Sequence, residues 1–223
     1  MKYTLAIFDM DGTLADTSPG IIRCHQYAHR MMGRSEPEET ILREVIGGPL
    51  LETYCGRFGF SEEDARRAVA FYRQRYAEKG IYEAVLYPGM KGTLKALREQ
   101  GLLLGIATLK AERFAKEIVG YLGISDCFDA IFGMDERDQR SKSELIRLCM
   151  ETLSVSRRET VLIGDSIHDW KGAREAQVDF IGVTYGFGLQ KGARPEGIIL
   201  CHSPAELPQI LLTADKAFHI PEK

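Results

Sequence analysis

The chain has 223 residues, of which 44% are hydrophobic, and a formal net charge of −3. A chain of this length can bury one large core, or a core domain together with a smaller one. The small net charge and the lack of a long basic block in the sequence argue against nucleic acid as the main ligand, because binding to a phosphate backbone requires clustered Lys and Arg.

The sequence also argues against secretion and membrane insertion. Met1 and Lys2 lead into only a few apolar residues before Asp9, unlike a secretory signal. No apolar run approaches the roughly 20 residues that a membrane span requires. The five cysteines are scattered and contain no C-x-x-C pair, which favours free thiols over a disulfide framework or a zinc site. We therefore expect a cytoplasmic protein with no membrane partner.

Short apolar runs alternate with helical patterns along most of the chain. The first run, Tyr3–Phe8, ends at acidic and glycine residues, as expected for a buried strand. Such alternation is typical of β-α-β units and predicts an α/β fold with a Rossmann-like, doubly wound parallel sheet. Further strands are predicted at Leu102–Ala107, Ala130–Phe132, Val161–Ile163 and Phe180–Val183.

Several helix ends can be predicted from capping residues. Ser61 followed by Asp64, and Ser141 followed by Glu144, have the spacing of an N-terminal capping box. Gly101 and Gly123 each follow a helical pattern and are predicted to end a helix.

One long stretch interrupts the alternation. Residues 17–84 contain helical patterns without a convincing strand, and Tyr87-Pro88-Gly89 marks the return to the sheet. We therefore predict an α/β core domain formed by residues 1–16 and 85–223, with an α-helical domain at residues 17–84 inserted after the first strand.

Two aspartates, Asp9 and Asp11, follow the first predicted strand beside a glycine. Ligands of open α/β sheets bind at the carboxyl ends of the strands. Two carboxylates so close together in an apolar setting repel each other, and a bound cation relieves that repulsion. Oxygen ligands suit a hard ion such as Mg²⁺. Taken alone, however, so short a segment fits an ordinary acidic turn after a strand at least equally well.

The segment D-M-D-G-T-L-A-D-T, which starts at Asp9, resembles the first motif of haloacid dehalogenase (HAD) phosphatases. The three later motifs of that family follow in order. The apolar run 102–107 ends at Thr108, Ser141-Lys142-Ser143 supplies a lysine, and G-D-S-I-H-D contains Asp165 and Asp169. Many relatives have proline where this chain has Ser143. One branch of the family carries an α-helical cap between its first and second motifs, where residues 17–84 lie.

The resemblance implies a two-step phosphatase mechanism. Asp9 is expected to attack phosphorus and form an aspartyl phosphate. Asp11 is expected to protonate the leaving group and then to take a proton from water. Thr108 and Lys142 are expected to bind the phosphate, and Lys142 also neutralises charge on Asp9.

The resemblance also implies how Mg²⁺ is held. The expected metal ligands are Asp9, the backbone carbonyl of Asp11, and Asp165. Asp169 is expected to steady either the metal's water shell or Lys142. The family also implies that the cap closes over the core and excludes water.

Within the family, Gly12-Thr13-Leu14 and the helical cap resemble phosphoglycolate phosphatase-like enzymes that act on a small phosphorylated metabolite. A pyrophosphatase or nucleotidase of the same family is an alternative. So is a phosphomutase of the β-phosphoglucomutase type, although Thr13 favours hydrolysis because those mutases often carry an apolar residue there. A catalytically silent binding module is the alternative from another class. A dehalogenase is disfavoured because dehalogenases lack the Asp11 carboxylate.

Three further features have weaker implications. His25 and His29 have a spacing compatible with metal binding, but an ordinary helix face is favoured because no acidic partner is nearby in the sequence. His168 lies inside the fourth motif, which does not require histidine. The segment Tyr185–Gly188 resembles a loop near the active site and has no assigned role.

Overall fold

The computed structural model describes residues 3–135, 139–189 and 195–213. The chain divides into two compact units. The first comprises Met1–Asp16 and Leu86–Lys223, and the second comprises Thr17–Val85. We refer to them as the sheet unit and the helical unit and describe each in turn.

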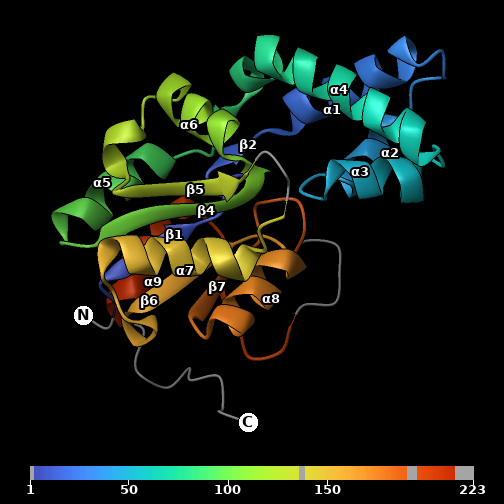
Figure 1. The fold of residues 1–223 in the computed structure, drawn as a ribbon. Helices are drawn as coiled ribbons and strands as arrows, with labels where there is room; N and C mark the ends of the chain where they lie inside the picture. Colours follow the sequence, from blue (N-terminus) through green and yellow to red (C-terminus); the bar gives the residue numbers. More distant parts are fainter. Residues whose placement is uncertain (1–2, 136–138, 190–194, 214–223) are drawn as a thin grey trace. The chain divides into compact units, whose positions relative to one another are not determined.

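The sheet unit is built on a six-stranded sheet with the strand order β5-β4-β1-β6-β7-β8 (Figure 1). Every neighbouring pair of strands in it is parallel, which confirms the predicted fold class. All residues of β1 are buried, as expected for a central strand covered on both faces. The strands are β1 (Leu5–Phe8), β4 (Leu103–Ala111), β5 (Ala130–Met134), β6 (Thr160–Gly164), β7 (Asp179–Val183) and β8 (Ile199–Cys201).

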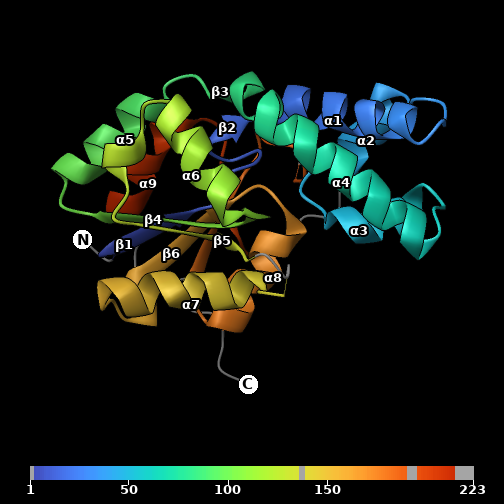
Figure 2. The same ribbon diagram turned by 45° about the horizontal axis from the view of Figure 1, so that its top comes forward.

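Helices cover both faces of this sheet. Figures 1 and 2 show α7 and α8 on one face and α5, α6 and α9 on the other. A buried cluster beneath α7 and α8 includes Leu5 and Ile7 of β1 together with Leu145 and Ile146 of α7. The helices are α5 (Met90–Glu99), α6 (Glu112–Tyr121), α7 (Lys142–Leu153), α8 (Ile167–Ala176) and α9 (Leu207–Thr213), with single 3₁₀ turns at η3 (Ser125–Cys127), η4 (Arg157–Glu159) and η5 (Pro204–Glu206).

Two helices of the sheet unit begin with complete capping boxes. The Ser141 hydroxyl accepts a hydrogen bond from the backbone of Glu144, whose side chain accepts one from the Ser141 backbone, as predicted. Ser166 and Asp169 form the same reciprocal pair at the start of α8. These caps satisfy backbone donors that the first turn of a helix leaves without partners. They therefore fix where the residues of the first turns lie.

Two features of the sheet differ from the prediction. Strand β8 was not predicted, because three residues are too few to show a periodic pattern. Strand β4 is longer than predicted and continues to Ala111. Its register with β5 shifts between Ala107 and Ala111. Such irregularities re-aim side chains at the end of a strand, and here the affected residues are Thr108–Lys110.

The helical unit is built around the paired helices α1 and α4. Pro19 lies in the first turn of α1, where its missing N–H is not needed. Ser61 caps α4 by accepting a hydrogen bond from the Asp64 backbone, which is one half of the capping box predicted there. The elements are α1 (Ser18–Met31), α2 (Glu39–Glu44), α3 (Leu50–Glu52), the π-helix η1 (Thr53–Arg57), α4 (Glu62–Glu78) and the 3₁₀ helix η2 (Gly80–Glu83). The short strands β2 (Ala15–Asp16) and β3 (Val85–Leu86) pair where the chain passes between the units.

The two histidines of α1 belong to the core of the helical unit. His25 is buried, with its Nδ1 atom 3.1 Å from the Tyr54 hydroxyl and its ring 4.8 Å from that of Tyr72. His29 packs edge-on against Phe58, 4.6 Å between ring centroids. Both therefore serve as aromatic core residues of the helical unit.

All five cysteines are free thiols, as expected; Cys24, Cys149 and Cys201 are buried and the other two are partly buried. In the described part of the chain, no helix combines the length and hydropathy that crossing a bilayer requires.

Candidate active site

The strand order brings the predicted site residues together at one edge of the sheet, the edge formed by the carboxyl ends of its strands. Strand β1 lies between β4 and β6, and the Asp9 backbone N–H donates to the carbonyl of Ile163 at the end of β6. Asp9 follows β1, Thr108 lies near the end of β4, and Asp165 directly follows β6. This is the switch point of a doubly wound sheet, where neighbouring strands leave toward opposite sides and ligands bind.

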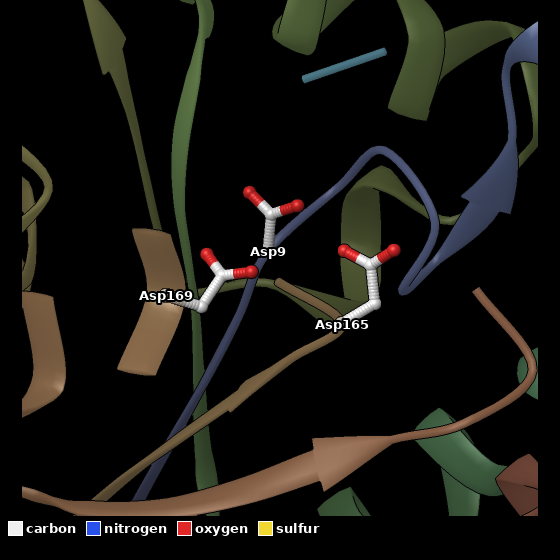
Figure 3. A group of neighbouring side chains, drawn as sticks. All are labelled: Asp9, Asp165 and Asp169. Atoms are coloured by element: carbon white, nitrogen blue, oxygen red, sulfur yellow. The ribbon is translucent and has the colours of Figure 1, made fainter. Parts of the chain in front are cut away.

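Three carboxylates lie close together at this edge. Asp9, Asp165 and Asp169 each offer an oxygen atom, and these atoms lie within 4.8 Å of one another. Figure 3 shows the three carboxyl groups projecting to the same side, from the end of β1, the loop after β6 and the first turn of α8. All three side chains are buried. An oxygen-only set of this kind fits a hard divalent cation.

Lys142 is the cation of this cluster. Its Nζ atom lies 2.6 Å from Oδ1 of Asp9 and 2.7 Å from Oδ1 of Asp169, and it donates to the carbonyl of Ala107 at 2.8 Å. Lysine in the first turn of a helix opposes the helix dipole, and these anions offset that cost. Gly172 of α8 makes room for the lysine, because a Cβ there would lie 2.4 Å from Cγ of Lys142.

The charges of the cluster are not balanced, because it contains three carboxylates and the ammonium group of Lys142 contacts two of them. Burial raises the pKa of Asp9 to about 7, against the pull of Lys142, and the nearby Asp169 and Asp11 carboxylates raise it further. Burial, together with Asp169 and Asp9, also raises the pKa of Asp165 well above its ordinary value. The same anions keep the pKa of Lys142 above its ordinary range despite its burial. A bound divalent cation would offset the excess negative charge, so the residues present fit Mg²⁺.

Asp11 is not part of the cluster of three aspartates, and it forms an ion pair with a different lysine. Nζ of Lys110 lies 3.0 Å from Oδ2 of Asp11, and both side chains are largely buried. Sequence reasoning missed Lys110; the signal available was its position two residues after Thr108. The Asp11 carboxylate is thus separate from the metal-type cluster, and the family resemblance assigns its backbone carbonyl, not its carboxylate, to the metal.

Thr108 and Thr13 are both buried at this edge of the sheet. The Thr108 hydroxyl accepts a hydrogen bond from the backbone N–H of Lys110 at 3.2 Å, so its own proton is available to another acceptor. The Thr13 hydroxyl has no hydrogen-bond partner among the described residues. Buried hydroxyls without partners are uncommon and mark places where a ligand or water completes the bonding.

Asp169 has two roles in the structure. One oxygen accepts from Lys142, and the other accepts from the backbone N–H and the hydroxyl of Ser166 at 3.0 and 2.6 Å. Gly164 permits this arrangement, since a Cβ there would lie 2.5 Å from Cγ of Asp169. Of the two expected partners of Asp169, the lysine is therefore the one seen in contact. His168, next in the chain, is exposed on α8.

The segment Tyr185–Gly188, which had no role assigned from the sequence, lies against Asp165. The backbone N–H groups of Phe187 and Gly188 donate to Oδ2 of Asp165 at 2.6 and 3.1 Å. The Tyr185 hydroxyl donates to the carbonyl of Thr13 at 3.2 Å. This loop therefore contacts both acidic turns of the site. Backbone donors of this kind leave no residue-type pattern, so the sequence could not reveal them.

The sequence is similar to a known protein family and to several known relatives. A family model described as haloacid dehalogenase-like hydrolase matches residues 6–183. A 5'-nucleotidase of Pseudomonas aeruginosa is 37% identical over 95% of this chain and 96% of its own. A phosphoglycolate phosphatase of Psychrobacter arcticus is 29% identical over 87% of this chain and 89% of its own.

Solved structures give the same result. The crystal structure of a predicted phosphatase from Clostridium acetobutylicum matches with a TM-score of 0.88 and 31% identity, over 95% of this chain and 99% of that one. The match of the family model extends over both acidic motifs of the site. The chain therefore belongs to the haloacid dehalogenase-like hydrolase family.

Proposed function

We propose that this hydrolase is a Mg²⁺-dependent phosphatase that cleaves a small phosphomonoester through an aspartyl phosphate on Asp9. The observation that carries the proposal is the contact of Lys142 with Asp9 inside a buried group of three carboxylates. A buried ammonium group against a would-be nucleophile neutralises charge before an anionic substrate arrives. Bound Mg²⁺ would supply further positive charge between the carboxylates and the phosphate.

Each reacting group of this chain has a distinct task. A carboxylate oxygen of Asp9 attacks phosphorus, and the bond from phosphorus to the leaving oxygen breaks. That oxygen takes a proton from Asp11. In the second step water attacks phosphorus and gives a proton to Asp11, and the bond from Asp9 to phosphorus breaks to release inorganic phosphate. Thr108 donates its hydroxyl proton to a phosphate oxygen, and Lys142 balances the charge on Asp9.

Two substrate classes are supported by the relatives. The Pseudomonas protein named 5'-nucleotidase is the more similar of the two relatives described, which supports nucleoside 5'-monophosphates. The protein named phosphoglycolate phosphatase supports a small phosphorylated acid. Thr13, the residue that favours hydrolysis over mutase chemistry, does so for either substrate class. We therefore expect phosphate release from a substrate of one of these two classes.

The test is phosphate release from a panel of phosphorylated compounds, with Mg²⁺ and with EDTA. The panel contains nucleoside 5'-monophosphates, phosphoglycolate, sugar phosphates and pyrophosphate. Wild-type protein is expected to release phosphate only with Mg²⁺, and Asp9→Asn is expected to release none. Isomerisation of a sugar phosphate without release would identify a mutase instead. Tight binding of a panel member without turnover would identify a binding module.

A further inference from the structure

The loop Tyr185–Gly188 follows β7 and turns its backbone toward Asp165. Phe187 and Gly188 both donate their N–H groups to Oδ2 of this carboxylate, at 2.6 and 3.1 Å. The next residue, Leu189, donates its N–H to the backbone carbonyl of Asp165 at 2.7 Å. Three successive amides thus bind one aspartate, which fixes both the position of its backbone and the orientation of its carboxyl plane.

Glycines make this approach possible. A Cβ on Gly186 would lie 2.2 Å from the carbonyl oxygen of Gly12 and 2.5 Å from Cβ of Asp165. A Cβ on Gly188 would lie 2.7 Å from the carbonyl oxygen of Asp165. These obstacles are backbone atoms and a buried side chain, which cannot swing aside as an exposed side chain can. Any larger residue at position 186 must therefore push the loop away from Asp165.

The same loop is anchored to the turn that carries Asp9. The Tyr185 hydroxyl donates to the carbonyl of Thr13, and the Tyr185 ring packs against that of Tyr87 with 4.8 Å between centroids. The loop therefore connects the turn after β1 with the turn after β6, and both turns carry carboxylates of the metal-type cluster.

The two amides also determine which oxygen of Asp165 is available. Oδ2 accepts two N–H donors, which use both of its lone pairs. Among the described residues, no hydrogen bond reaches Oδ1. A carboxylate arranged in this way offers a cation one oxygen. One oxygen per carboxylate suits the octahedral coordination of Mg²⁺, whereas Ca²⁺ often takes both oxygens of a carboxylate.

We propose that the loop Tyr185–Gly188 is a positioning element for the cation, in which the Phe187 and Gly188 amides hold Asp165 so that Oδ1 alone faces the metal. The proposal rests on the proposed function, because it assumes that Asp165 binds Mg²⁺. It extends that function, because it makes the affinity for Mg²⁺ depend on a loop that supplies no side-chain ligand to the metal. Groups that orient a metal ligand typically contribute 10- to 100-fold to metal affinity.

The test is calorimetric titration of metal-free protein with MgCl₂, without substrate. Gly186→Ala displaces the loop and is expected to weaken Mg²⁺ binding by about 10-fold or more. Gly92→Ala is the matched control, because a Cβ on Gly92 meets no atom within 4 Å; this variant is expected to bind Mg²⁺ like the wild type. Thermal unfolding in EDTA reports any purely structural effect separately.

A second variant keeps the test decisive if Gly186→Ala does not fold. Tyr185→Phe removes only the hydroxyl that contacts Thr13, and losing one such bond is expected to weaken Mg²⁺ binding roughly 2- to 10-fold. If the folded variants bind Mg²⁺ with wild-type affinity, or lose only thermal stability, the loop is not a positioning element. If the wild type itself binds no Mg²⁺, the metal dependence in the proposed function is wrong instead.

Discussion

The ammonium group of Lys110 lies 3.0 Å from Oδ2 of Asp11, and this pair stands beside the pair that Lys142 forms with Asp9. Each aspartate of the D-x-D segment therefore has its own largely buried lysine. The two lysines come from different elements, since Lys110 lies on β4 and Lys142 begins α7. Because Lys142 serves the expected nucleophile, Lys110 is placed to hold the expected acid–base group.

Lys110→Met is predicted to impair proton transfer by Asp11 and leave the nucleophile intact. Methionine keeps the apolar stem of the lysine but loses the charge that orients the carboxylate. We expect kcat for an alkyl phosphate to fall about 10-fold or more, since acid–base groups contribute 10²- to 10⁴-fold. The loss should be smaller for p-nitrophenyl phosphate, whose leaving group needs little protonation.

The control for this measurement is Lys116→Met, which changes an exposed lysine of α6 paired with Glu112. It is expected to leave kcat for both substrates unchanged. Equal losses for the alkyl and the nitrophenyl substrate in Lys110→Met would show that Lys110 does not act through the proton of Asp11.

Lys142→Met is predicted to destabilise the metal-free protein and to make it more dependent on Mg²⁺. The substitution leaves Asp9 and Asp169 buried without their cation, and breaking a buried ion pair in this way typically costs 3–5 kcal/mol. Added Mg²⁺ restores positive charge to the same carboxylates. The rise in melting temperature between EDTA and Mg²⁺ should therefore be larger in Lys142→Met than in the wild type.

Lys171→Met provides the comparison, because Lys171 is an exposed lysine of α8. Its melting temperature should respond to Mg²⁺ as the wild type does. An equal Mg²⁺ response in Lys142→Met and Lys171→Met would mean that Lys142 does not balance the charge of the carboxylates.

The helical unit is predicted to lose stability in acid through His25. Burial, with a smaller contribution from His29, lowers the pKa of His25 to about 3, against about 6.5 in an unfolded chain. Between these values the unfolded chain binds a proton that the folded unit does not, so stability is complete above about pH 6.5 and falls as the pH falls toward 3. One such group gives a slope of about 1.4 kcal/mol per pH unit.

Urea unfolding between pH 4 and 7 measures this slope, and His25→Gln should reduce it. His168→Gln, which changes an exposed histidine, should keep the wild-type slope. The assignment to His25 fails if both variants follow the wild type. His29, whose pKa burial also lowers, is expected to contribute to the slope that remains in His25→Gln.

Two glycine-to-alanine changes in helices are predicted to have opposite effects. Alanine is favoured over glycine inside a helix by about 1 kcal/mol. Gly92→Ala in α5 meets open space and should therefore stabilise the protein. Gly172→Ala in α8 would place Cβ 2.4 Å from Cγ of Lys142, and overpacking of this kind costs about 1–3 kcal/mol.

Chemical denaturation of both variants measures the difference. Gly172→Ala should also lower phosphatase activity, because the displaced lysine no longer contacts Asp9 as it does in the wild type. A stabilised and fully active Gly172→Ala would show that Lys142 has room to move without consequence.

The parallel sheet, its central strands and several helix starts could be predicted from the sequence alone. These features are encoded locally, because apolar runs, capping residues and their spacing act over a few neighbouring residues. The order of the motifs also predicted which residues gather at the sheet edge. Asp9 and Asp165 each follow a strand, Thr108 lies near the end of another, and parallel strands bring their carboxyl ends together.

The tertiary structure alone decided which groups in that site touch one another. The shift in register near the end of β4, the pairing of Lys110 with Asp11, and the amides that bind Asp165 all depend on contacts between distant segments. Strand β8 likewise exists only through its pairing with β7, at the edge of the sheet. Such pairings depend on how neighbouring strands align and where turns direct their backbone N–H groups, and neither is encoded in the spacing of residue types along the chain.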